Sequence, residues 1–320
     1  MDLTKMKVIC SGSIRKAALP YLEGKVDLKL WQQHGRVPAE TWKEWLQDAD
    51  AIYSTGNIRI NEELLSQAPH LKVIAQASVG YDNFDLAACR AHNVLVGNTP
   101  GVLVNAVADL AYGLLIDTAR GIVRGYQHVT SGLWGARKAL GLGVDLYGKT
   151  LGIVGMGDIG QAIARRAEVS GMQVIYHNRH RKLNDTALHA RYVSFDELLA
   201  TADFIVVSVT LNPSTKGMFN RDAFAKMKDG VRFVNISRGK VVDTDALYEA
   251  LKSGKVAAAG LDVTDPEPLP GDHPVLGLPN LTVTPHIASA TAETRDAMAI
   301  VTAQNILAAL AGEDMPSRVR

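Results

Sequence analysis

The chain alternates short apolar runs with stretches whose apolar residues recur at helical spacing. The runs are rich in β-branched residues and end in turn-forming residues, which is typical of strands. They lie at residues 6–12, 50–56, 71–78, 93–100, 149–157, 172–178, 202–210, 231–237, 255–263 and 281–286. Because continuous apolar runs leave no polar face, they indicate parallel sheets covered by helices on both sides. We therefore predict an α/β fold with two doubly wound parallel sheets.

A helical segment and an arm separate the two sheets. In residues 98–129, Pro100 can open a helix and apolar residues then recur at helical spacing. Residues 130–149 are rich in Gly and look like an extended arm. The second sheet begins after this arm, near Lys149.

The last part of the chain is predicted to return to the first sheet. Residues 292–313 have the alternation of a long amphipathic helix, which needs an apolar surface to cover. We therefore predict one domain made of residues 1–98 with 289–320, and a second made of residues 99–288.

Composition and charge narrow the functional classes. The 320 residues are 47% hydrophobic and 21% charged, with a net charge of +1. This charge gives no general attraction to nucleic acid or to an anionic membrane, and no apolar run approaches the roughly 20 residues of a membrane helix. Cys10 and Cys89 make neither a disulfide framework nor a metal-binding spacing. We expect a cytoplasmic protein without a signal peptide or a bound metal.

A Gly-x-Gly-x-x-Gly pattern follows the first strand of the second sheet. Gly155, Gly157 and Gly160 stand at the mouth of a helix, where a pyrophosphate can approach the backbone and meet the N–H groups of Asp158 and Ile159. An ordinary Gly-rich turn is the alternative, and the acidic Asp158 is unfavourable beside a phosphate. The strand that follows the helix favours a dinucleotide site.

The tip of that next strand is basic. In dinucleotide-binding folds an acidic residue about 20 positions after the glycines binds the ribose 2′-hydroxyl of NAD. Here Asn178 stands 23 positions after Gly155, followed by Arg179 and His180, and no carboxylate is present. These donors suit a 2′-phosphate, and each charge-assisted bond contributes about 1.5–3 kcal/mol. We predict NADPH in preference to NADH; a solvated basic loop without a ligand is the alternative.

Three chemically active side chains follow three other strands of the second sheet. Arg238, Glu267 and His286 come after strands that end at one sheet edge, the edge where a dinucleotide binds. His286 can donate a proton to an alkoxide, Glu267 can stabilise its imidazolium, and Arg238 can bind a substrate carboxylate. Each also has a structural explanation alone, as a helix cap, a solvated acid or a satisfied histidine. Together they suit reduction of a 2-oxo acid by hydride transfer.

The first sheet offers a candidate anion site. Val79 and Gly80 lie between a strand and a helix, where their backbone N–H groups can bind a carboxylate. Ser54 and Thr55 occupy the corresponding loop of a neighbouring strand and supply small polar groups. Simple strand-to-helix turns are the alternative for both loops.

These residues occur in motifs that resemble the NAD(P)-dependent D-isomer-specific 2-hydroxyacid dehydrogenases, and most closely their glyoxylate/hydroxypyruvate reductase branch, which includes 2-ketogluconate reductases. The motifs run in the family's order over nearly the whole chain: SVGYDNFD, NTPGVLVNAVADLAYGLL, GKTLGIVGMGDIG, FVNISRGKVVD, AAAGLDVTDPEPLP and TVTPHIASATAETR. The resemblance implies a Rossmann cofactor domain over 99–288 and a flavodoxin-like substrate domain over the remainder.

The resemblance also implies roles for individual residues. It makes Arg238, Glu267 and His286 catalytic, with Arg238 and His286 also binding substrate, and it implies a homodimer in which Trp134 reaches the neighbouring active site. Asp262 would contact the carboxamide side of the cofactor. Cofactor contacts are further predicted at the strand ends of the second sheet: Val209, Thr210, Ile236, Ser237, Asp262 and Ala288.

Two positions depart from the family's pattern. Thr210 stands where a Pro is common, and Val104 stands where many relatives have Thr. Contacts near the cofactor are expected to differ there, but neither position belongs to the proposed catalytic groups.

Three functions are compatible with these observations. The first is an NADPH-dependent reductase that converts glyoxylate or hydroxypyruvate to D-2-hydroxy acids between two closing domains. The second keeps the chemistry but uses a larger 2-oxo acid, such as 2-ketogluconate or hydroxyphenylpyruvate. The third is a non-catalytic protein that senses a dinucleotide. The complete set of Arg, Glu and His argues against a purely sensing role.

Overall fold

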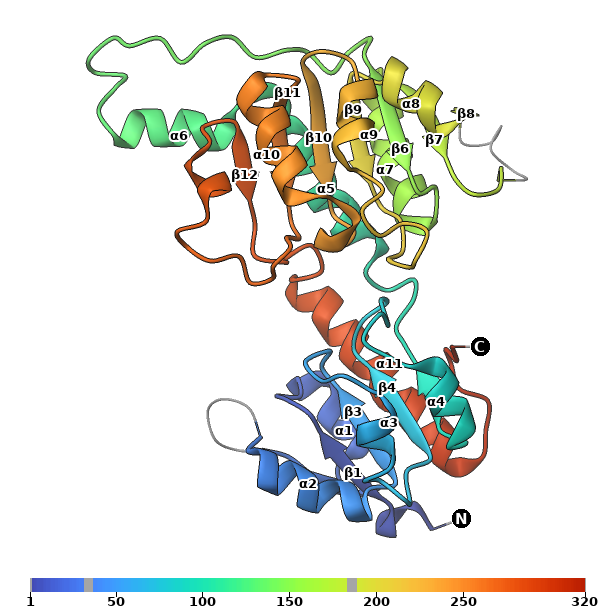
Figure 1. The fold of residues 1–320 in the computed structure, drawn as a ribbon. Helices are drawn as coiled ribbons and strands as arrows, with labels where there is room; N and C mark the ends of the chain where they lie inside the picture. Colours follow the sequence, from blue (N-terminus) through green and yellow to red (C-terminus); the bar gives the residue numbers. More distant parts are fainter. Residues whose placement is uncertain (1, 32–36, 183–188, 320) are drawn as a thin grey trace. The chain divides into compact units, whose positions relative to one another are not determined.

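The chain forms two compact α/β units (Figure 1). The structure is a computed structural model and describes residues 2–31, 37–182 and 189–319. One unit comprises Met1–Leu103 with Ala290–Arg320, and the other comprises Val104–Ser289. The first segment of this unit therefore ends at Leu103, five residues after the boundary predicted at residue 98. Residues just after 98 stay with the first unit because the Thr99 N–H donates to the Ser78 carbonyl at 3.0 Å.

Within the described residues, the first unit is built on a five-stranded parallel sheet of order β2-β1-β3-β4-β5. This is the flavodoxin-like order, so the predicted fold class is confirmed for this unit. Its strands are β1 (Lys7–Cys10), β2 (Asp27–Lys29), β3 (Ala51–Ser54), β4 (Val73–Gln76) and β5 (Leu95–Gly97). Its helices are α1 (Leu19–Leu22), α2 (Ala39–Asp48), α3 (Glu62–Leu65), α4 (Leu86–Ala91) and α11 (Ala292–Ala311).

Side chains of this sheet alternate between two apolar layers. Ile52 and Ile74 pack in a cluster with residues of α2, α3 and α4. Their neighbours Tyr53 and Ala75 pack in a second cluster with residues of α1 and α11. The predicted return of the C-terminal helix to the first unit is therefore confirmed.

Over the part of the chain that the structure describes, the second unit contains a seven-stranded parallel sheet of order β12-β11-β10-β9-β6-β7-β8. The strands are β6 (Thr150–Val154), β7 (Gln173–His177), β8 (Ala190–Tyr192), β9 (Phe204–Val207), β10 (Val231–Asn235), β11 (Val256–Leu261) and β12 (Leu281–Val283). The helices are α5 (Val104–Arg120), α6 (Ile122–Thr130), α7 (Asp158–Val169), α8 (Phe195–Thr201), α9 (Arg221–Lys226) and α10 (Thr244–Ser253). This order is that of a Rossmann fold, as predicted.

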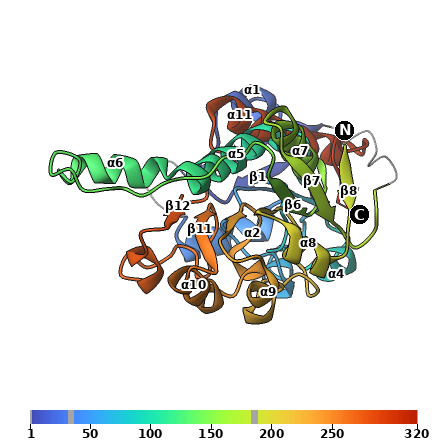
Figure 2. The same ribbon diagram turned by 90° about the horizontal axis from the view of Figure 1, so that it is seen from above.

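Helices cover both faces of the second sheet. Figure 2 shows α5 and α7 on one side of its strands and α8, α9 and α10 on the other. The layer under α8, α9 and α10 is rich in aromatic and branched side chains, among them Phe219, Phe224 and Phe233. All strands of the sheet run in parallel, so the loops at their carboxyl ends lie along one edge and form the candidate site.

Two details of the sequence-based prediction were wrong. The single helix expected over 98–129 starts only at Val104 and is divided into α5 and α6 at Gly121, whose φ of 63° is outside the helical range. The edge strands β2 and β8 were not predicted. Their sequences, DLK and ARY, are short and polar, so they lack the apolar run that marks a central strand.

Candidate active site

The glycine motif forms the turn between β6 and α7. Gly155 has a φ of 104°, and a Cβ at this position would lie 2.7 Å from the Ser208 carbonyl group. A Cβ at Gly160 would lie 2.2 Å from the Gly155 carbonyl oxygen, so this glycine lets the helix approach the turn. Gly157 has no atom within 4 Å of such a Cβ, which leaves its backbone open. This geometry fits a bound pyrophosphate, the role predicted for the motif.

The beginning of α7 adds hydrogen-bond donors to this turn. Gly157 is the N-cap residue and offers no side-chain cap, so the first N–H groups of the helix, including those of Asp158 and Ile159, are not capped by a side chain. Asp158 itself is exposed. The residues present therefore fit the phosphates of a dinucleotide, with Asp158 able to turn towards solvent.

The basic tip of β7 lies next to the glycine turn. The Asn178 side-chain oxygen accepts a hydrogen bond of 2.6 Å from the Met156 N–H, within the turn itself. Arg179 and His180 follow directly and are exposed. A guanidinium nitrogen of Arg179 lies 3.4 Å from the Ser214 hydroxyl. The structural role of Asn178 was not predicted: its side-chain oxygen orients the glycine turn. Its amide nitrogen remains at the tip of β7, where the cofactor is predicted to bind.

The predicted contacts after β9 and β10 lie at the same edge. The Ser208 hydroxyl donates to the Gly155 carbonyl at 2.6 Å, and the Ser237 hydroxyl donates to the Val209 carbonyl at 2.5 Å. Ile236 and Ser237 are buried, whereas Thr210 is exposed. These bonds fix the strand ends beside the glycine turn, and Thr210 is the residue whose side chain is open to a ligand.

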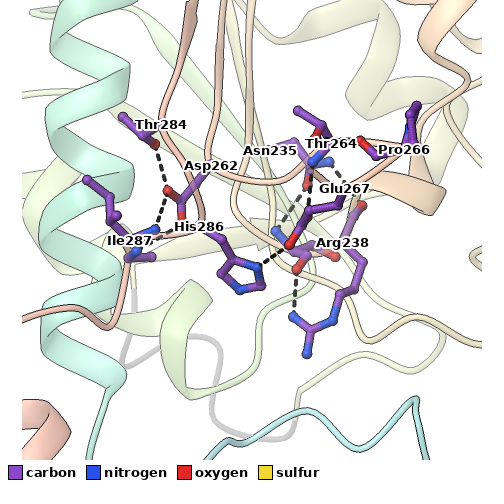
Figure 3. A network of polar contacts seen from close by, with 11 residues as sticks. Asn235, Arg238, Asp262, Thr264, Pro266, Glu267, Thr284, His286 and Ile287 are labelled. Carbon is purple, nitrogen blue, oxygen red and sulfur yellow. Dashed lines mark hydrogen bonds and ion pairs between the residues drawn. The ribbon is translucent and has the colours of Figure 1, made fainter. Parts of the chain in front are cut away.

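His286 and Glu267 form a hydrogen-bonded pair at the carboxyl ends of β12 and β11 (Figure 3). Nδ1 of His286 lies 2.6 Å from Oε1 of Glu267, and the side chains are 44% and 40% exposed. This hydrogen bond, with smaller contributions from the Thr264 N–H and the Arg238 charge, lowers the pKa of Glu267 despite partial burial. An ionised carboxylate only accepts, so Nδ1 carries the hydrogen of this bond. Nε2 has no partner among the described residues and is the nitrogen open to a substrate.

Arg238 lies beside this pair at the end of β10. Asn235 donates to the Arg238 carbonyl at 3.1 Å, and an Arg238 guanidinium nitrogen donates to the Ser237 carbonyl at 2.9 Å. A Cβ on the next residue, Gly239, would lie 1.9 Å from the Thr264 carbonyl oxygen, so only glycine allows this close approach to the loop that carries Glu267. Figure 3 shows Glu267 between the side chains of His286 and Arg238. The three predicted catalytic residues are therefore brought together.

Asp262, a predicted cofactor contact, is buried and bonded to the loop that follows β12. The residue is 1% exposed. One carboxylate oxygen accepts from the Ile287 N–H at 2.8 Å and the Thr284 hydroxyl at 2.6 Å, and the other accepts from the Ala288 N–H at 2.9 Å. The carboxylate therefore holds the loop that carries His286, and its predicted contact with the cofactor carboxamide stays a prediction. The same bond occupies the N–H of Ala288, leaving only its carbonyl for a cofactor.

This support matters because His286 has an unusual backbone conformation. Its φ of 54° is in the left-handed region, which non-glycine residues seldom adopt. The His286 N–H donates to the Asp262 carbonyl at 3.0 Å, so both the backbone and the side chain of Asp262 stabilise this conformation. A buried acid directly after the apolar strand β11 was the signal that could have indicated this role.

The candidate anion site in the first unit is only partly supported. The N–H groups of Val79 and Gly80 donate to no acceptor within the described part of the chain, which suits an anion. The Thr55 hydroxyl is half-buried and donates to Asn57 at 3.0 Å. Ser54 is fully buried: its hydroxyl donates to Gln76 at 3.0 Å and accepts from the Gly56 N–H. The Ser54 side chain therefore links its own loop to Gln76 of β4, and its predicted contact with substrate stays a prediction.

The described residues contain neither a metal-binding cluster nor a helix that could span a membrane. No group of three or more His, Cys, Asp or Glu side chains in the described residues could hold a metal ion. In the same residues, no helix combines the length and the apolar character needed to cross a bilayer.

Known proteins share both sequence and fold with this chain. The family model for the NAD-binding domain of D-isomer specific 2-hydroxyacid dehydrogenases matches residues 112–288. A glyoxylate reductase of Pyrococcus furiosus is 42% identical, covering 98% of this chain and 95% of the relative. A human glyoxylate reductase/hydroxypyruvate reductase is 43% identical, covering 92% and 91%.

A solved structure agrees with these sequence relatives. The NADPH-dependent glyoxylate/hydroxypyruvate reductase of Sinorhizobium meliloti, in complex with NADP and malonate, matches with a TM-score of 0.86 at 31% identity, covering 98% of this chain and 96% of that one. The protein is therefore an oxidoreductase that belongs to the D-isomer-specific 2-hydroxyacid dehydrogenase family.

Proposed function

We propose that the protein is an NADPH-dependent reductase of small 2-oxo acids, which converts glyoxylate or hydroxypyruvate to the D-2-hydroxy acid. The observation that carries this proposal is the 2.6 Å contact between Nδ1 of His286 and Glu267, with Arg238 alongside. It lies at the strand-end edge of a nucleotide-binding fold, where a proton donor and a carboxylate-binding cation are needed together. The names of the relatives support the substrate class.

In the proposed reaction a bound dinucleotide supplies the hydride. Arg238 binds the substrate carboxylate and polarises the carbonyl through its planar, permanently charged group. His286 donates a proton from Nε2 to the oxygen of the former carbonyl as negative charge develops there. Glu267 keeps Nδ1 engaged, which orients the ring and compensates its positive charge before the proton leaves. Val79 and Gly80 contribute N–H groups to the substrate carboxylate.

The preference for NADPH rests on the tip of β7. Arg179 and His180 are exposed, Asn178 borders the glycine turn, and residues 178–182 contain no carboxylate. A 2′-phosphate would therefore meet donors and positive charge rather than an acid. The relative from Sinorhizobium meliloti, whose structure holds NADP, supports this assignment.

We propose a homodimer because the arm of the second unit exposes large apolar side chains. Figure 1 shows α6 and the chain after it projecting from the sheet of that unit. Tyr126, Trp134 and Leu142 are 70%, 71% and 98% exposed in a single chain. Apolar exposure on this scale favours a protein partner, and a second copy would cover it. Light scattering that gives the mass of a monomer would refute this part of the proposal.

The first experiment follows the absorbance of reduced nicotinamide during incubation of the purified protein with glyoxylate or hydroxypyruvate. NADPH and NADH are compared at equal concentrations. Rapid oxidation of NADPH and slow oxidation of NADH is expected. Oxidation only with 2-ketogluconate or hydroxyphenylpyruvate would replace the substrate assignment, and equal rates with both nucleotides would refute the role of the basic tip.

A further inference from the structure

The loop after β4 has its backbone carbonyls tied to buried or part-buried donors. The Ser78 carbonyl accepts from the Thr99 N–H at 3.0 Å. The Val79 carbonyl accepts from the side-chain amide of Asn98 at 3.0 Å, and the Gly80 carbonyl accepts from that of Gln76 at 2.9 Å. Three successive peptide groups are thus held by their oxygen atoms.

These bonds determine where the N–H groups of the loop point. In a planar trans peptide the N–H lies opposite the C=O of the preceding residue. Fixing the carbonyls of Ser78 and Val79 therefore directs the N–H groups of Val79 and Gly80 away from the donors. Both N–H groups lack an acceptor within the described ranges, so they form a preoriented pair for a carboxylate.

Asn98 is itself held by the C-terminal segment of the chain. Its side-chain oxygen accepts from the Ser317 hydroxyl at 2.8 Å, and its carbonyl accepts from the Asn305 side chain at 3.0 Å. Asn305 also accepts from the Ser317 N–H at 2.8 Å. Asn98 and Asn305 are buried. The hydroxyl of Ser317 can donate to the Asn98 oxygen, which leaves the Asn98 nitrogen facing Val79.

The segment that carries Ser317 is anchored along the edge of the sheet. The Val319 N–H donates to the Val96 carbonyl at 2.8 Å, and Arg318 forms an antiparallel bridge with Gly97. Met315 packs against the same edge, since a Cβ on Gly97 would lie 2.7 Å from its terminal methyl carbon. We call residues 313–319 the C-terminal strap.

We propose that Asn98 is a positioning residue for the substrate carboxylate, and that the C-terminal strap holds it through Ser317. This inference rests on the proposed function, in which Val79 and Gly80 bind that carboxylate. Asn98 does not touch substrate. It orients the peptide between Val79 and Gly80. The C-terminal strap therefore affects substrate affinity through Asn98, although the strap lies far from Val79 and Gly80 in the sequence.

The test compares Asn98→Asp and Ser317→Ala with the wild-type enzyme. An aspartate keeps the size of Asn98 and its acceptor for Ser317 but cannot donate to the Val79 carbonyl when ionised. We expect KM for glyoxylate to rise about tenfold or more, as when a hydrogen bond to a charged group is weakened, while kcat changes little. Ser317→Ala should raise KM by a smaller factor. Asn61→Asp, which keeps the N-cap of α3, is the matched control and should leave KM unchanged.

The result that overturns the proposal is an unchanged KM in both variants, or a loss of kcat equal to the rise in KM. If Asn98→Asp does not fold, the KM of Ser317→Ala decides, because that variant removes only a hydroxyl group.

A second measurement separates this inference from the proposed function. The unreactive carboxylate oxamate is titrated into the isotope-labelled full chain, and the amide resonances of Val79 and Gly80 are followed. Saturable shifts that are weakened in Asn98→Asp support the inference even if the wild-type protein reduces no 2-oxo acid. Turnover of glyoxylate with identical oxamate binding in both proteins keeps the function and overturns the positioning role.

Discussion

The carboxylate of Glu267 accepts a hydrogen bond of 2.6 Å from Nδ1 of His286, although 19 positions separate the two residues in the chain. The bond leaves Nε2 as the nitrogen from which a proton can be transferred. The glutamate orients the imidazole ring through this bond, so the two residues are expected to act as a unit.

Replacing His286 by Ala should remove the proton donor without affecting the nucleotide site. We expect kcat to fall by about 10²–10⁴-fold, the usual contribution of a positioned acid, with NADPH affinity retained. Steady-state kinetics and fluorescence titration with NADPH test this. The matched control is His92→Ala, since His92 also pairs with a glutamate, Glu62, in the other unit. Near-full turnover of His286→Ala would place the proton donor elsewhere.

Acid should remove the stability that the Glu267 carboxylate provides. Its pKa is lowered by the hydrogen bond from His286, so the folded state favours the ionised form. This stabilisation is fully present above the ordinary glutamate pKa of about 4.3 and is lost as pH falls through the lower folded-state pKa. The melting temperature of the wild type should exceed that of Glu267→Gln at neutral pH, and the difference should shrink below about pH 4.

The exposed Glu249 on α10 supplies the control, as Glu249→Gln. A wild-type advantage over Glu267→Gln that persists unchanged to the lowest pH would show that the carboxylate charge is not its source.

Reversing the charge of Arg179 should alter the choice of cofactor. If Arg179 binds the 2′-phosphate of NADPH, Arg179→Asp should lower the ratio of kcat/KM for NADPH to that for NADH by at least about tenfold. The exposed Arg221 lies at the start of α9, and Arg221→Asp should leave the ratio unchanged. An unaltered ratio in Arg179→Asp would mean that the basic tip is a solvated loop.

Asp262→Asn should destabilise the loop that carries His286. An amide nitrogen in place of one carboxylate oxygen would face a backbone N–H that the native carboxylate satisfies, at a buried site. We expect the free energy of unfolding in urea to fall by about 1–3 kcal/mol, together with a reduced kcat. Asp222→Asn, at an exposed position of α9, should have neither effect. A fully stable and active Asp262→Asn would contradict the supporting role.

The sequence predicted the parts of the fold that depend on central strands. Runs such as residues 202–210 and 231–237 became β9 and β10 because strands buried on both faces tolerate few polar residues. The division of the predicted helix at Gly121 was missed because a single glycine inside a helical pattern is ambiguous until its φ is known.

The sequence predicted those residues of the candidate site that directly follow strands of the second sheet. Arg238, Glu267 and His286 follow three strands of one parallel sheet, so topology alone brings them together. The structural roles of Ser54 and Asp262 could not be predicted from their positions in the sequence. Whether a polar side chain at a strand end faces a ligand or is buried under a loop depends on its rotamer and on partners such as Gln76.

Because α11 completes the first unit but comes late in the chain, the two units can finish folding at different times during synthesis. Ala303 and Ile306 of this helix are fully buried in the apolar layer that also contains Val8 and Tyr53, near the other end of the chain. A growing polypeptide therefore makes the whole of Val104–Ser289 before it makes the helix that covers the first sheet. The cofactor-binding unit can fold while the first unit still exposes an apolar surface, and the first unit becomes complete only after α11 has been made.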